Sequence, residues 1–364
     1  MRVLLCMGTR PEIIKMAPLY IEMKRRREFE VVICFSGQHT DLANEVLDYF
    51  RITPDLRFCA MREGQSLSEL NIKLLNFFDK AIDKVKPELV LVHGDTATAF
   101  AAALSAFYKG VKIGHIEAGL RTYCTRNPFP EEMYRVSVDA MADYHFAPTD
   151  FSRKNLEAEG RKSVFTVGNT VIDALRYTVK EDYSSPLLCA ADGRKILLLT
   201  THRRENVGEK MLSALLGIGE ALQEREDAYC ILPAHPNPSV RRAISGAFQN
   251  VKNIKICEPL PICDFHNILA RSHLVLTDSG GVQEEAAYLG VPIFILRSTT
   301  ERAEAIEGGN ARLIGTDREQ VASYLKSVLE NPHLIQHMRK RSTAFGDGHA
   351  SAKIVKTLLQ NFKF

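Results

Sequence analysis

The chain has 364 residues, of which 45% are hydrophobic and 25% are charged, a composition typical of globular proteins. This length exceeds the size at which a single hydrophobic core keeps growing, so two domains are expected. The net charge of +3 is nearly balanced for so long a chain, which excludes a broad electrostatic surface for nucleic acid or for an anionic membrane. A small anionic ligand needs only a local cluster of cations and is not excluded.

Short apolar runs alternate with helical patterns in the first half of the chain. The runs cover residues 2–7, 30–35, 88–92, 111–117, 143–147 and 164–167. Longer amphipathic patterns such as 66–85 and 131–142 lie between them. Short, continuously apolar strands separated by helices indicate a parallel sheet that is buried on both faces. The first run is too short for the core of a secretory signal, and no stretch approaches the ~18 apolar residues of a membrane helix.

A second series of the same kind begins at residues 195–199. It continues with runs at 228–233, 253–257, 273–277, 291–296 and 311–314. Between the two series, periodicity lapses and Ser, Pro, Asp and Gly accumulate, which is typical of a linker. We therefore predict a domain at 1–180, a linker at 181–194 and a second domain at 195–364, with the final helix as a candidate to pack back on the first domain.

The predicted fold class is α/β, with two Rossmann-like, doubly wound domains that face each other across a cleft. Such sheets bind ligands at the carboxyl ends of their strands. The eight cysteines are scattered and form no Cys-x-x-Cys pair, which favours reduced thiols in a cytoplasmic protein and gives no sign of a zinc site or a disulfide framework.

The polar residues after the first strand form a candidate anion site. Arg10 and Lys15 flank the start of the next helix, and a helix amino terminus attracts anions. An ordinary strand-to-helix turn with solvated charges explains this motif equally well when it is taken alone. Neither a Gly-x-Gly-x-x-Gly at this turn nor a Walker lysine motif occurs, so the sequence does not support nicotinamide binding or phosphoryl transfer by a P-loop.

Three carboxylates follow at neighbouring strand ends of the first domain. Asp95 taken alone is explained by capping of the next helix, and Glu131 by the preference of acids for helix amino termini. Glu117 ends an apolar run in which an unpaired charge would be costly to bury. It therefore belongs either to a neutralised polar cluster or to a site, and three acids at one domain edge exceed what capping needs.

The second domain carries cations and glycines at the corresponding places. His202, Arg203 and Arg204 follow its first strand and form a cluster suited to phosphate. Ser279, Gly280 and Gly281 follow its fourth strand and open a helix whose amides are able to bind a diphosphate. Glu285, one turn further on, is a candidate acceptor for ribose hydroxyls.

Ten motifs in order carry a resemblance to a known family. They are GTRPE at 8–12, GQH at 37–39, HGDT at 93–96, GHIEAGLRT at 114–122, PFPEE at 128–132, GNTVIDAL at 168–175, THRREN at 201–206, TDSGGVQEEA at 277–286, TTERAEAIEGGNARLIGTD at 299–317 and FGDGHAS at 345–351. The chain resembles the non-hydrolysing UDP-N-acetylglucosamine 2-epimerases, bacterial and archaeal enzymes of the GT-B fold. Each motif is weak alone, but the ordered set spans nearly the whole chain.

The resemblance implies reversible inversion at carbon 2 of UDP-N-acetylglucosamine (UDP-GlcNAc) to give UDP-N-acetylmannosamine (UDP-ManNAc). It implies elimination of UDP to a 2-acetamidoglucal, followed by re-addition. The family's catalytic residues fall on Asp95, Glu117, Glu131 and His202. Those that bind the UDP-sugar fall on Arg10, Lys15, His202, Arg203, Ser279, Gly280, Gly281 and Glu285. His115 is expected to support the Glu117 loop.

The resemblance further implies a cytoplasmic homodimer that needs no cofactor and no metal and supplies precursors for surface polysaccharide. Gln38 and His39 resemble the region through which bacterial members bind a second UDP-GlcNAc as an activator. The chain departs from the family's pattern at Thr40, Asp41 and Leu42, and at Tyr134, where asparagine is usual. These departures put the activation and the exact sugar in question.

Alternatives to this function follow from the same residues. A related 2-epimerase would act on a diacetamido or uronic acid UDP-sugar, and a hydrolysing epimerase would release free ManNAc and UDP. A GT-B glycosyltransferase is disfavoured by PFPEE and by the full set of acids. A catalytically silent UDP-sugar sensor would keep residues 277–285 and would have no need of Asp95, Glu117 and Glu131.

Overall fold

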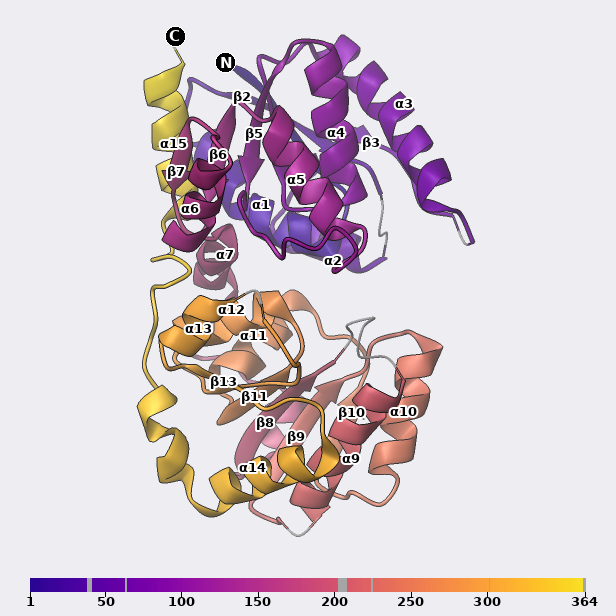
Figure 1. Ribbon diagram of the computed structural model, residues 1–364, viewed down its shortest axis with the longest axis vertical. Coiled ribbons are helices and arrows are strands. Elements are labelled where there is room, and N and C mark those ends of the chain that lie inside the picture. Colours follow the sequence, from indigo (N-terminus) through magenta and orange to yellow (C-terminus); the bar gives the residue numbers. More distant parts are fainter. Residues whose placement is uncertain (38–40, 63, 202–207, 224, 301, 363–364) are drawn as a thin grey trace. The chain divides into compact units, whose positions relative to one another are not determined.

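The computed structural model describes residues 1–37, 41–62, 64–201, 208–223, 225–300 and 302–362. Gln38, His39, His202 and Arg203 lie outside these residues. The chain divides into two compact units, one formed by Met1–Arg176 with Phe345–Phe364 and the other by Tyr177–Ala344 (Figure 1). We call them the first and the second unit.

The first unit is built on a parallel sheet. In its described residues, seven strands take the order β3-β2-β1-β4-β5-β6-β7. They are β1 (Arg2–Met7), β2 (Glu30–Phe35), β3 (Leu56–Arg57), β4 (Leu89–His93), β5 (Lys112–Ile116), β6 (Tyr144–Ala147) and β7 (Val164–Thr166). The register pairs Leu4 with Val32 of β2 and with Val90 of β4. The central strands β1 and β4 are almost entirely buried, as their apolar runs predict.

Helices cover both faces of this sheet. They are α1 (Arg10–Lys24), α2 (Asp41–Tyr49), α3 (Leu67–Val85), α4 (Ala97–Tyr108), α5 (Glu131–Met141), α6 (Asp150–Ala158), α7 (Thr170–Thr178) and α15 (Ala350–Asn361). Contacts join α3 to α4 and α4 to α5 on one face, and α1 to α2 and α15 on the other. Apolar side chains of α3, α4 and α5 pack with β1 and β4 into a single core.

Local sequence explains where the helices of this unit begin. Thr9 and Ser66 cap α1 and α3 in capping boxes with Glu12 and Glu69. In this arrangement the hydroxyl binds an amide of the first turn and the glutamate binds back to the cap. Thr96 caps α4 in the same way, without the returning glutamate. Each cap lies at the end of the loop that follows a strand, so the side chains of the loop face the carboxyl edge of the sheet.

The second unit repeats the plan. Its described strands take the order β10-β9-β8-β11-β12-β13. They are β8 (Lys195–Thr200), β9 (Ala228–Pro233), β10 (Ile254–Cys257), β11 (Leu274–Thr277), β12 (Ile293–Ile295) and β13 (Ala311–Leu313). All neighbours in both sheets are parallel. The predicted α/β class with two doubly wound sheets is confirmed.

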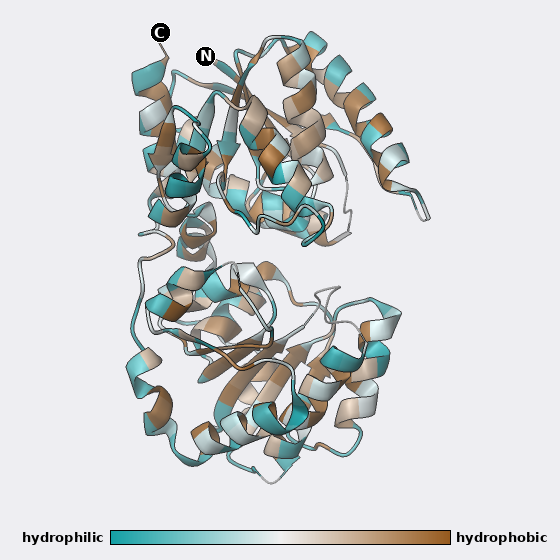
Figure 2. Cartoon of the chain, viewed as in Figure 1, coloured by the Kyte–Doolittle hydropathy of each residue, from teal (hydrophilic) through white to brown (hydrophobic). Residues whose placement is uncertain are grey.

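Helices also lie on both faces of the second sheet. They are α8 (Pro186–Cys189), α9 (Glu209–Gln223), α10 (Pro238–Phe248), α11 (Ile262–Ala270), α12 (Gly280–Leu289), α13 (Ala303–Glu307), α14 (Arg318–Glu330) and the 3₁₀ helix η2 (Pro332–Met338). Contacts join α9 to α10 and α14, and α12 to α11 and α13. In both units hydrophobic residues lie along the strands and hydrophilic residues on the outer sides of the helices (Figure 2). No helix in the described part of the chain combines the length and the apolar character needed to cross a membrane.

The division between the units differs from the sequence expectation at the linker, but not at the last helix. Residues 181–194, the expected linker, lie in the second unit, where the Tyr183 hydroxyl donates to Asp264 and Arg271 donates to the carbonyl of Glu181. The last helix, α15, lies in the first unit and contacts α1. The second unit therefore ends at Ala344, and the chain returns to the first unit from Phe345 onward.

Candidate active site

Both sheets place the predicted site residues at a topological switch point. In the first sheet, β1 and β4 are neighbours whose following helices lie on opposite faces. The loops after these strands carry Arg10 and Asp95, and the loop after β5 carries Glu117. In the second sheet, Ser279 follows β11, which pairs with β8. Ligands of open α/β sheets bind at such points.

Glu117 lies at the centre of a buried polar cluster in the first unit. Its Oε2 accepts a hydrogen bond from the Lys15 ammonium group and a second one, of 2.6 Å, from Nδ2 of Asn169. Its side chain is only 7% exposed. Its backbone adopts a φ of 63°, a left-handed conformation that is uncommon outside glycine and concentrates at functional sites. Lys15, predicted at the UDP site, therefore pairs with this carboxylate.

His115 supports the Glu117 loop, as expected. Its Nε2 lies 2.8 Å from the Gly94 carbonyl and its Nδ1 lies 2.6 Å from Asp139. Burial acts to raise the pKa of Asp139, but His115 and Arg121 outweigh it and hold that pKa at about 2. Both ring nitrogens of His115 therefore face hydrogen-bond acceptors. The ring ties the β4 loop to the β5 loop.

Asp95 and Glu131 have different surroundings. Asp95 pairs with Arg135 of α5, and its side chain is 25% exposed. Arg135 also lies 3.4 Å from Glu132, whose other oxygen accepts from the amides of Thr122 and Tyr123. Glu131 opens α5 and is half-buried, and no hydrogen bond or ion pair joins it to another residue among those described. The structure thus brings Asp95 and Glu117 into paired clusters, and leaves Glu131 at the helix start.

His93 lies between these groups. Its Nε2 is 4.0 Å from Oε2 of Glu117 and is buried without a hydrogen-bond partner among the described residues. Burial lowers the pKa of His93 to about 3, although the Glu117 charge acts in the opposite direction. His93 is therefore a neutral imidazole at physiological pH and adds no positive charge beside Lys15.

Glu12 connects the loops after β1 and β4. It is fully buried, accepts from the amides of Gly8 and Thr9, and accepts from the Thr96 hydroxyl at 2.7 Å. Burial raises the pKa of Glu12 to about 6 in spite of these hydrogen bonds. Nη2 of Arg10, which follows Thr9 at the start of α1, lies 4.0 Å from Oε2 of Glu45 in α2.

The second unit presents a helix amino terminus and a buried acid. Ser279 is the N-cap of α12, and its side chain makes no capping hydrogen bond. The amides of Gly280 and Gly281 in the first turn have no partner within the helix, as at any helix start. Glu285 is buried, and its Oε2 has no hydrogen-bond partner in the described structure; Nε2 of His266 lies 3.6 Å away. A buried carboxylate oxygen without a donor invites one from a ligand.

Arg302 adds a cation to this helix start. Its guanidinium lies so close to Gly280 that a Cβ at that position would be 3.0 Å from Cζ. The Arg302 Nε donates to Glu284 at 2.8 Å, which fixes the guanidinium in place. A larger residue at 280 would force this guanidinium to shift.

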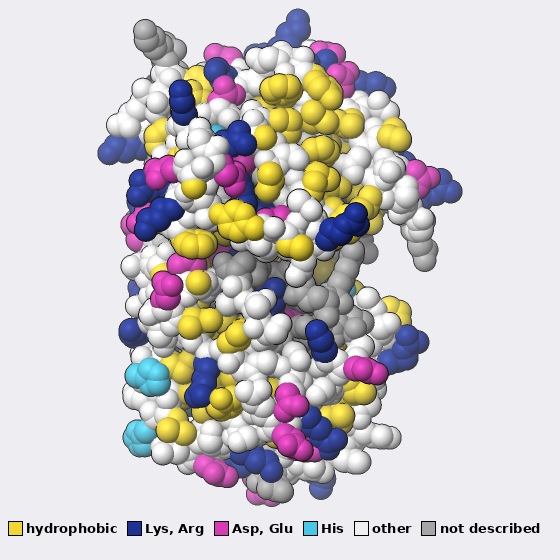
Figure 3. Space-filling model, in the orientation of Figure 1, with side chains coloured by type: hydrophobic (Ala, Val, Ile, Leu, Met, Phe, Trp, Pro, Cys, Tyr) yellow, Lys and Arg dark blue, Asp and Glu magenta, His cyan; other side chains and the backbone are white. Residues whose placement is uncertain are grey.

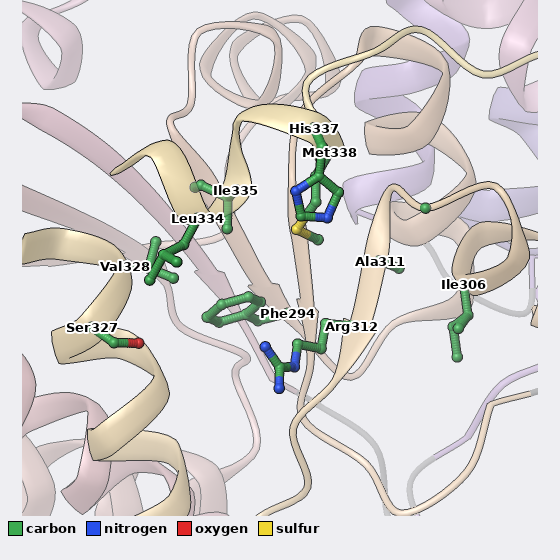
Figure 4. A pocket seen from close by; sticks show the side chains of 11 residues that line it. Phe294, Ile306, Ala311, Arg312, Ser327, Val328, Leu334, Ile335, His337 and Met338 are labelled. Atoms are coloured by element: carbon green, nitrogen blue, oxygen red, sulfur yellow. The ribbon is translucent and has the colours of Figure 1, made fainter. Parts of the chain in front are cut away.

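A separate cavity of about 310 Å³ lies at the edge of the second sheet (Figure 4). Its lining is mainly apolar and comes from β12, α13, β13, α14 and η2, with Arg312 and His337 as its charged or titratable members. None of the predicted site residues lines it. Among the described residues, no cluster of His, Cys, Asp and Glu side chains is arranged to hold a metal ion.

A family model described as UDP-N-acetylglucosamine 2-epimerase matches residues 21–359. The chain belongs to this UDP-N-acetylglucosamine 2-epimerase family. Among curated relatives, the enzyme of that name from Bacillus subtilis is 45% identical over 100% of this chain and 96% of its own length. The Escherichia coli K12 enzyme is 38% identical over 99% of both. An epimerase is an isomerase, and that is the enzyme class of the family.

Solved structures of the family support the fold. The UDP-GlcNAc 2-epimerase of Neisseria meningitidis bound to UDP-GlcNAc superposes with a TM-score of 0.94 at 38% identity, covering 99% of this chain and 100% of that one. The Methanocaldococcus jannaschii enzyme in complex with UDP-GlcNAc and UDP gives a TM-score of 0.86 at 31% identity, covering 99% and 100%. The predicted two-sheet architecture of this epimerase family is thus confirmed.

One departure of this chain from the epimerase pattern has a structural explanation. Tyr134, where the family usually has asparagine, is buried, and its ring stacks on Phe100 of α4 with ring centroids 5.1 Å apart. Its hydroxyl accepts from Asn71 of α3 at 2.9 Å. The residue therefore joins α3, α4 and α5.

Proposed function

We propose that this chain interconverts UDP-GlcNAc and UDP-ManNAc by inversion at carbon 2. Carbon 2 is not adjacent to a carbonyl, so direct removal of its proton would give an unstabilised carbanion. In the proposed route, a base takes that proton while the bond between carbon 1 and the UDP oxygen breaks. The products are UDP and 2-acetamidoglucal. Re-addition of the UDP oxygen to carbon 1, with a proton delivered to the other face of carbon 2, gives the epimer.

The Glu117 cluster carries this proposal. A buried carboxylate held by Lys15 and Asn169, on a strained backbone at a strand end, suits a positioned acid or base. Asp95, paired with Arg135, and Glu131 are the further acid or base groups, and His202 completes the proposed set. Low water access to the cluster would keep the glucal intermediate from being lost.

The residues at the start of α12 are proposed to hold the UDP moiety. The Gly280 and Gly281 amides and the Arg302 guanidinium suit the diphosphate, whose charge grows as the carbon 1 bond breaks. The unpartnered Oε2 of Glu285 suits a ribose hydroxyl. Arg10, Lys15, His202, Arg203 and Ser279 are proposed as further contacts to the UDP-sugar.

A panel of UDP-hexosamines tests the substrate. We expect NMR to show UDP-ManNAc accumulating from UDP-GlcNAc, and the reverse reaction from UDP-ManNAc. Turnover of only a diacetamido or uronic acid UDP-sugar would assign the chain to a modified substrate. Release of free ManNAc with UDP would identify a hydrolysing epimerase, and no turnover of any of these sugars would contradict the proposal.

We also propose that the enzyme is a cytoplasmic homodimer. Hydrophobic side chains gather over α4 and α5 on the surface of the first unit (Figure 3), and Ile72, Phe107, Tyr108 and Met133 of α3, α4 and α5 are exposed. Contiguous apolar surface of this kind is typical of a protein interface. All eight cysteines are free thiols, which suits a reducing compartment. UDP-ManNAc made there would supply surface polysaccharide. Light scattering should give twice the chain mass, and a monomer after Phe107→Glu.

A further inference from the structure

The return of the chain into the first unit bears on the Glu117 cluster. The motif at 345–351 lies against the motif at 168–175, and residues 345–351 have no role in the reaction described above. Two glycines meet where they cross, since a Cβ on Gly168 would lie 2.9 Å from the Gly346 Cα, and both glycines have positive φ. No other residue type fits this approach without displacing the backbone.

Three hydrogen bonds join the two motifs beside this crossing. The backbone N–H of Asn169 donates to the Phe345 carbonyl at 2.6 Å. Asp173 of α7 accepts from the Ala350 and Ser351 amides at 3.0 and 2.8 Å and so caps α15, whose own N-cap residue makes no side-chain hydrogen bond. We call the contact between residues 168–175 and 345–351 the C-terminal clasp.

The side chain that holds Glu117 comes from a residue of the clasp and is oriented by its own segment. Oδ1 of Asn169 accepts from the backbone N–H of Val171 at 3.1 Å. This bond determines the orientation of the Asn169 side-chain amide, so its Nδ2 faces Glu117. Asn169 is 2% exposed, and Nδ2 donates to the same carboxylate oxygen that Lys15 binds. Two donors on Oε2 fix the rotation of the carboxylate and favour its ionised form.

We propose that Asn169 is a positioning residue for Glu117 and that the C-terminal clasp sets its position. This inference rests on the proposed catalytic role of Glu117 and assigns a purpose to the last residues of the chain. The side chains that act on this carboxylate come from several elements. Lys15 of α1 and His93 of β4 lie beside it, and Asp95 and His115 act on His93. Asn169 is an uncharged hydrogen-bond donor to Glu117, so its removal changes hydrogen bonding without removing a cation.

The first test replaces the donor while keeping its shape. In Asn169→Asp, the oxygen that accepts from Val171 remains, and the donor to Glu117 becomes a carboxylate oxygen. We expect kcat to fall by ~10–100-fold, the factor that corresponds to a hydrogen bond to a charged group, with little change in KM. The acidic limb of the kcat profile should move to higher pH, because a neighbouring negative charge favours protonation of Glu117.

Asn155→Asp is the matched control. Asn155 is also buried and also serves the Glu117 loop, since it donates to the Gly119 carbonyl at 3.0 Å and accepts from the Tyr123 hydroxyl. It contacts no carboxylate in these bonds. Its variant should therefore lower thermal stability without moving the pH limb, and an equal shift in both variants would overturn the proposal.

A second test changes residues of the clasp that do not contact the Glu117 carboxylate. A Cβ in Gly346→Ala would lie 3.2 Å from the Asn169 nitrogen, so this variant should reproduce the pH shift although it touches no acid of the site. Asp173→Asn weakens the contact to α15 more gently and serves if Gly346→Ala does not fold. A folded clasp variant with reduced stability and an unmoved pH limb would overturn the role of the clasp.

A readout that does not use activity separates this inference from the proposed function. In protein labelled with ¹³C at the glutamate carboxyl, loss of one resonance in Glu117→Gln identifies Glu117. Its titration midpoint should rise in Asn169→Asp and stay in place in Asn155→Asp. An unmoved midpoint would overturn the inference even if Glu117→Gln is inactive, whereas an active Glu117→Gln would refute the catalytic role and leave this titration as the test of Asn169.

Discussion

The two units share a strand order, and they carry opposite kinds of group at the carboxyl ends of their strands. In the first unit, Glu117 and Asp95 each have a cationic partner from another element. In the second unit, Glu285 has a buried oxygen without a donor, and the helix start beside it presents amides. The position in the fold is therefore shared while the local side chains differ, which is why we propose that the first unit moves protons and the second binds the nucleotide.

The largest expected effect comes from removing an acid or base in the first unit. Replacement of Asp95, Glu117 or Glu131 by its amide, or of His202 by Asn, should each lower kcat by ~10²–10⁴-fold, the usual contribution of a positioned acid or base. Steady-state kinetics provides the measurement, and UDP affinity by calorimetry should be unchanged in the three carboxylate variants. Glu157→Gln on the exposed side of α6 is the control. Near-normal turnover in any amide variant would remove that residue from the mechanism.

A smaller effect, on UDP affinity rather than on kcat, is expected from a substitution in the second unit. Glu285→Ala removes the proposed acceptor of ribose hydroxyls, so UDP should bind ~10–100-fold more weakly, the range for a hydrogen bond to a charged group. Calorimetry with UDP measures this loss, and Glu319→Ala on exposed α14 should bind as the wild type does. Unchanged UDP affinity in Glu285→Ala would contradict the proposal that the second unit binds UDP through Glu285.

The sequence predicted the sheets and the loop residues of the two units, but it did not predict all of the residues that pair with them. Apolar runs at strand spacing predicted both sheets, and the polar residues after them predicted Glu117, Asp95 and the start of α12. The two-residue strand β3 is too short to show a period. The partners Arg135 and Asp139 were missed because they lie on a helix far along the chain. Their signal was present, since Glu132, Arg135 and Asp139 fall on one buried face of α5.

The contact between Asn169 and Glu117 had no comparable signal. It joins residues 52 positions apart, and its geometry depends on the Phe345 carbonyl, which is a backbone group that any residue would supply. Arg302 beside Gly280 was likewise missed as an individual residue, although its motif was recognised. Periodicity predicts which face of an element is buried, but tertiary packing decides which polar groups meet there.

The pH dependence of the free energy of unfolding should distinguish Glu12 from Glu69, the equivalent capping-box residue of α3. The pKa of Glu12 in the folded protein is about 6, above its usual 4.5, so between these values the folded state keeps a proton that the unfolded chain has lost. The free energy of unfolding should therefore fall by about 2 kcal/mol as pH rises through this range. Glu12→Gln should remove this part of the pH dependence of the thermal midpoint.

Glu69 of α3 is the control for this experiment. It occupies the same capping-box position, but a hydrogen bond from the Ser66 amide lowers the pKa of its exposed carboxyl. Its contribution is present above the usual value of 4.5 and is lost as pH falls. Glu69→Gln should therefore leave the slope between pH 4.5 and 6 nearly unchanged, and equal slopes for wild type and Glu12→Gln would contradict the account of Glu12.

The smallest expected effect is that of metal removal. The proposed chemistry uses carboxylates, a histidine and cations of the chain itself, so exhaustive chelation with EDTA should leave kcat unchanged. Activity that is lost on chelation and restored by a divalent cation alone would assign the diphosphate charge to a metal and would revise the role given to the second unit.

The fate of the proton at carbon 2 tests the central claim most directly. We expect UDP-GlcNAc in deuterium oxide to give UDP-ManNAc that carries deuterium at carbon 2, because the proton passes through side chains that exchange with solvent before a new one is delivered to the other face. Proton NMR should show loss of the carbon 2 signal in the product as it forms. UDP-ManNAc formed with its original proton at carbon 2 would contradict elimination and re-addition through the Glu117 cluster.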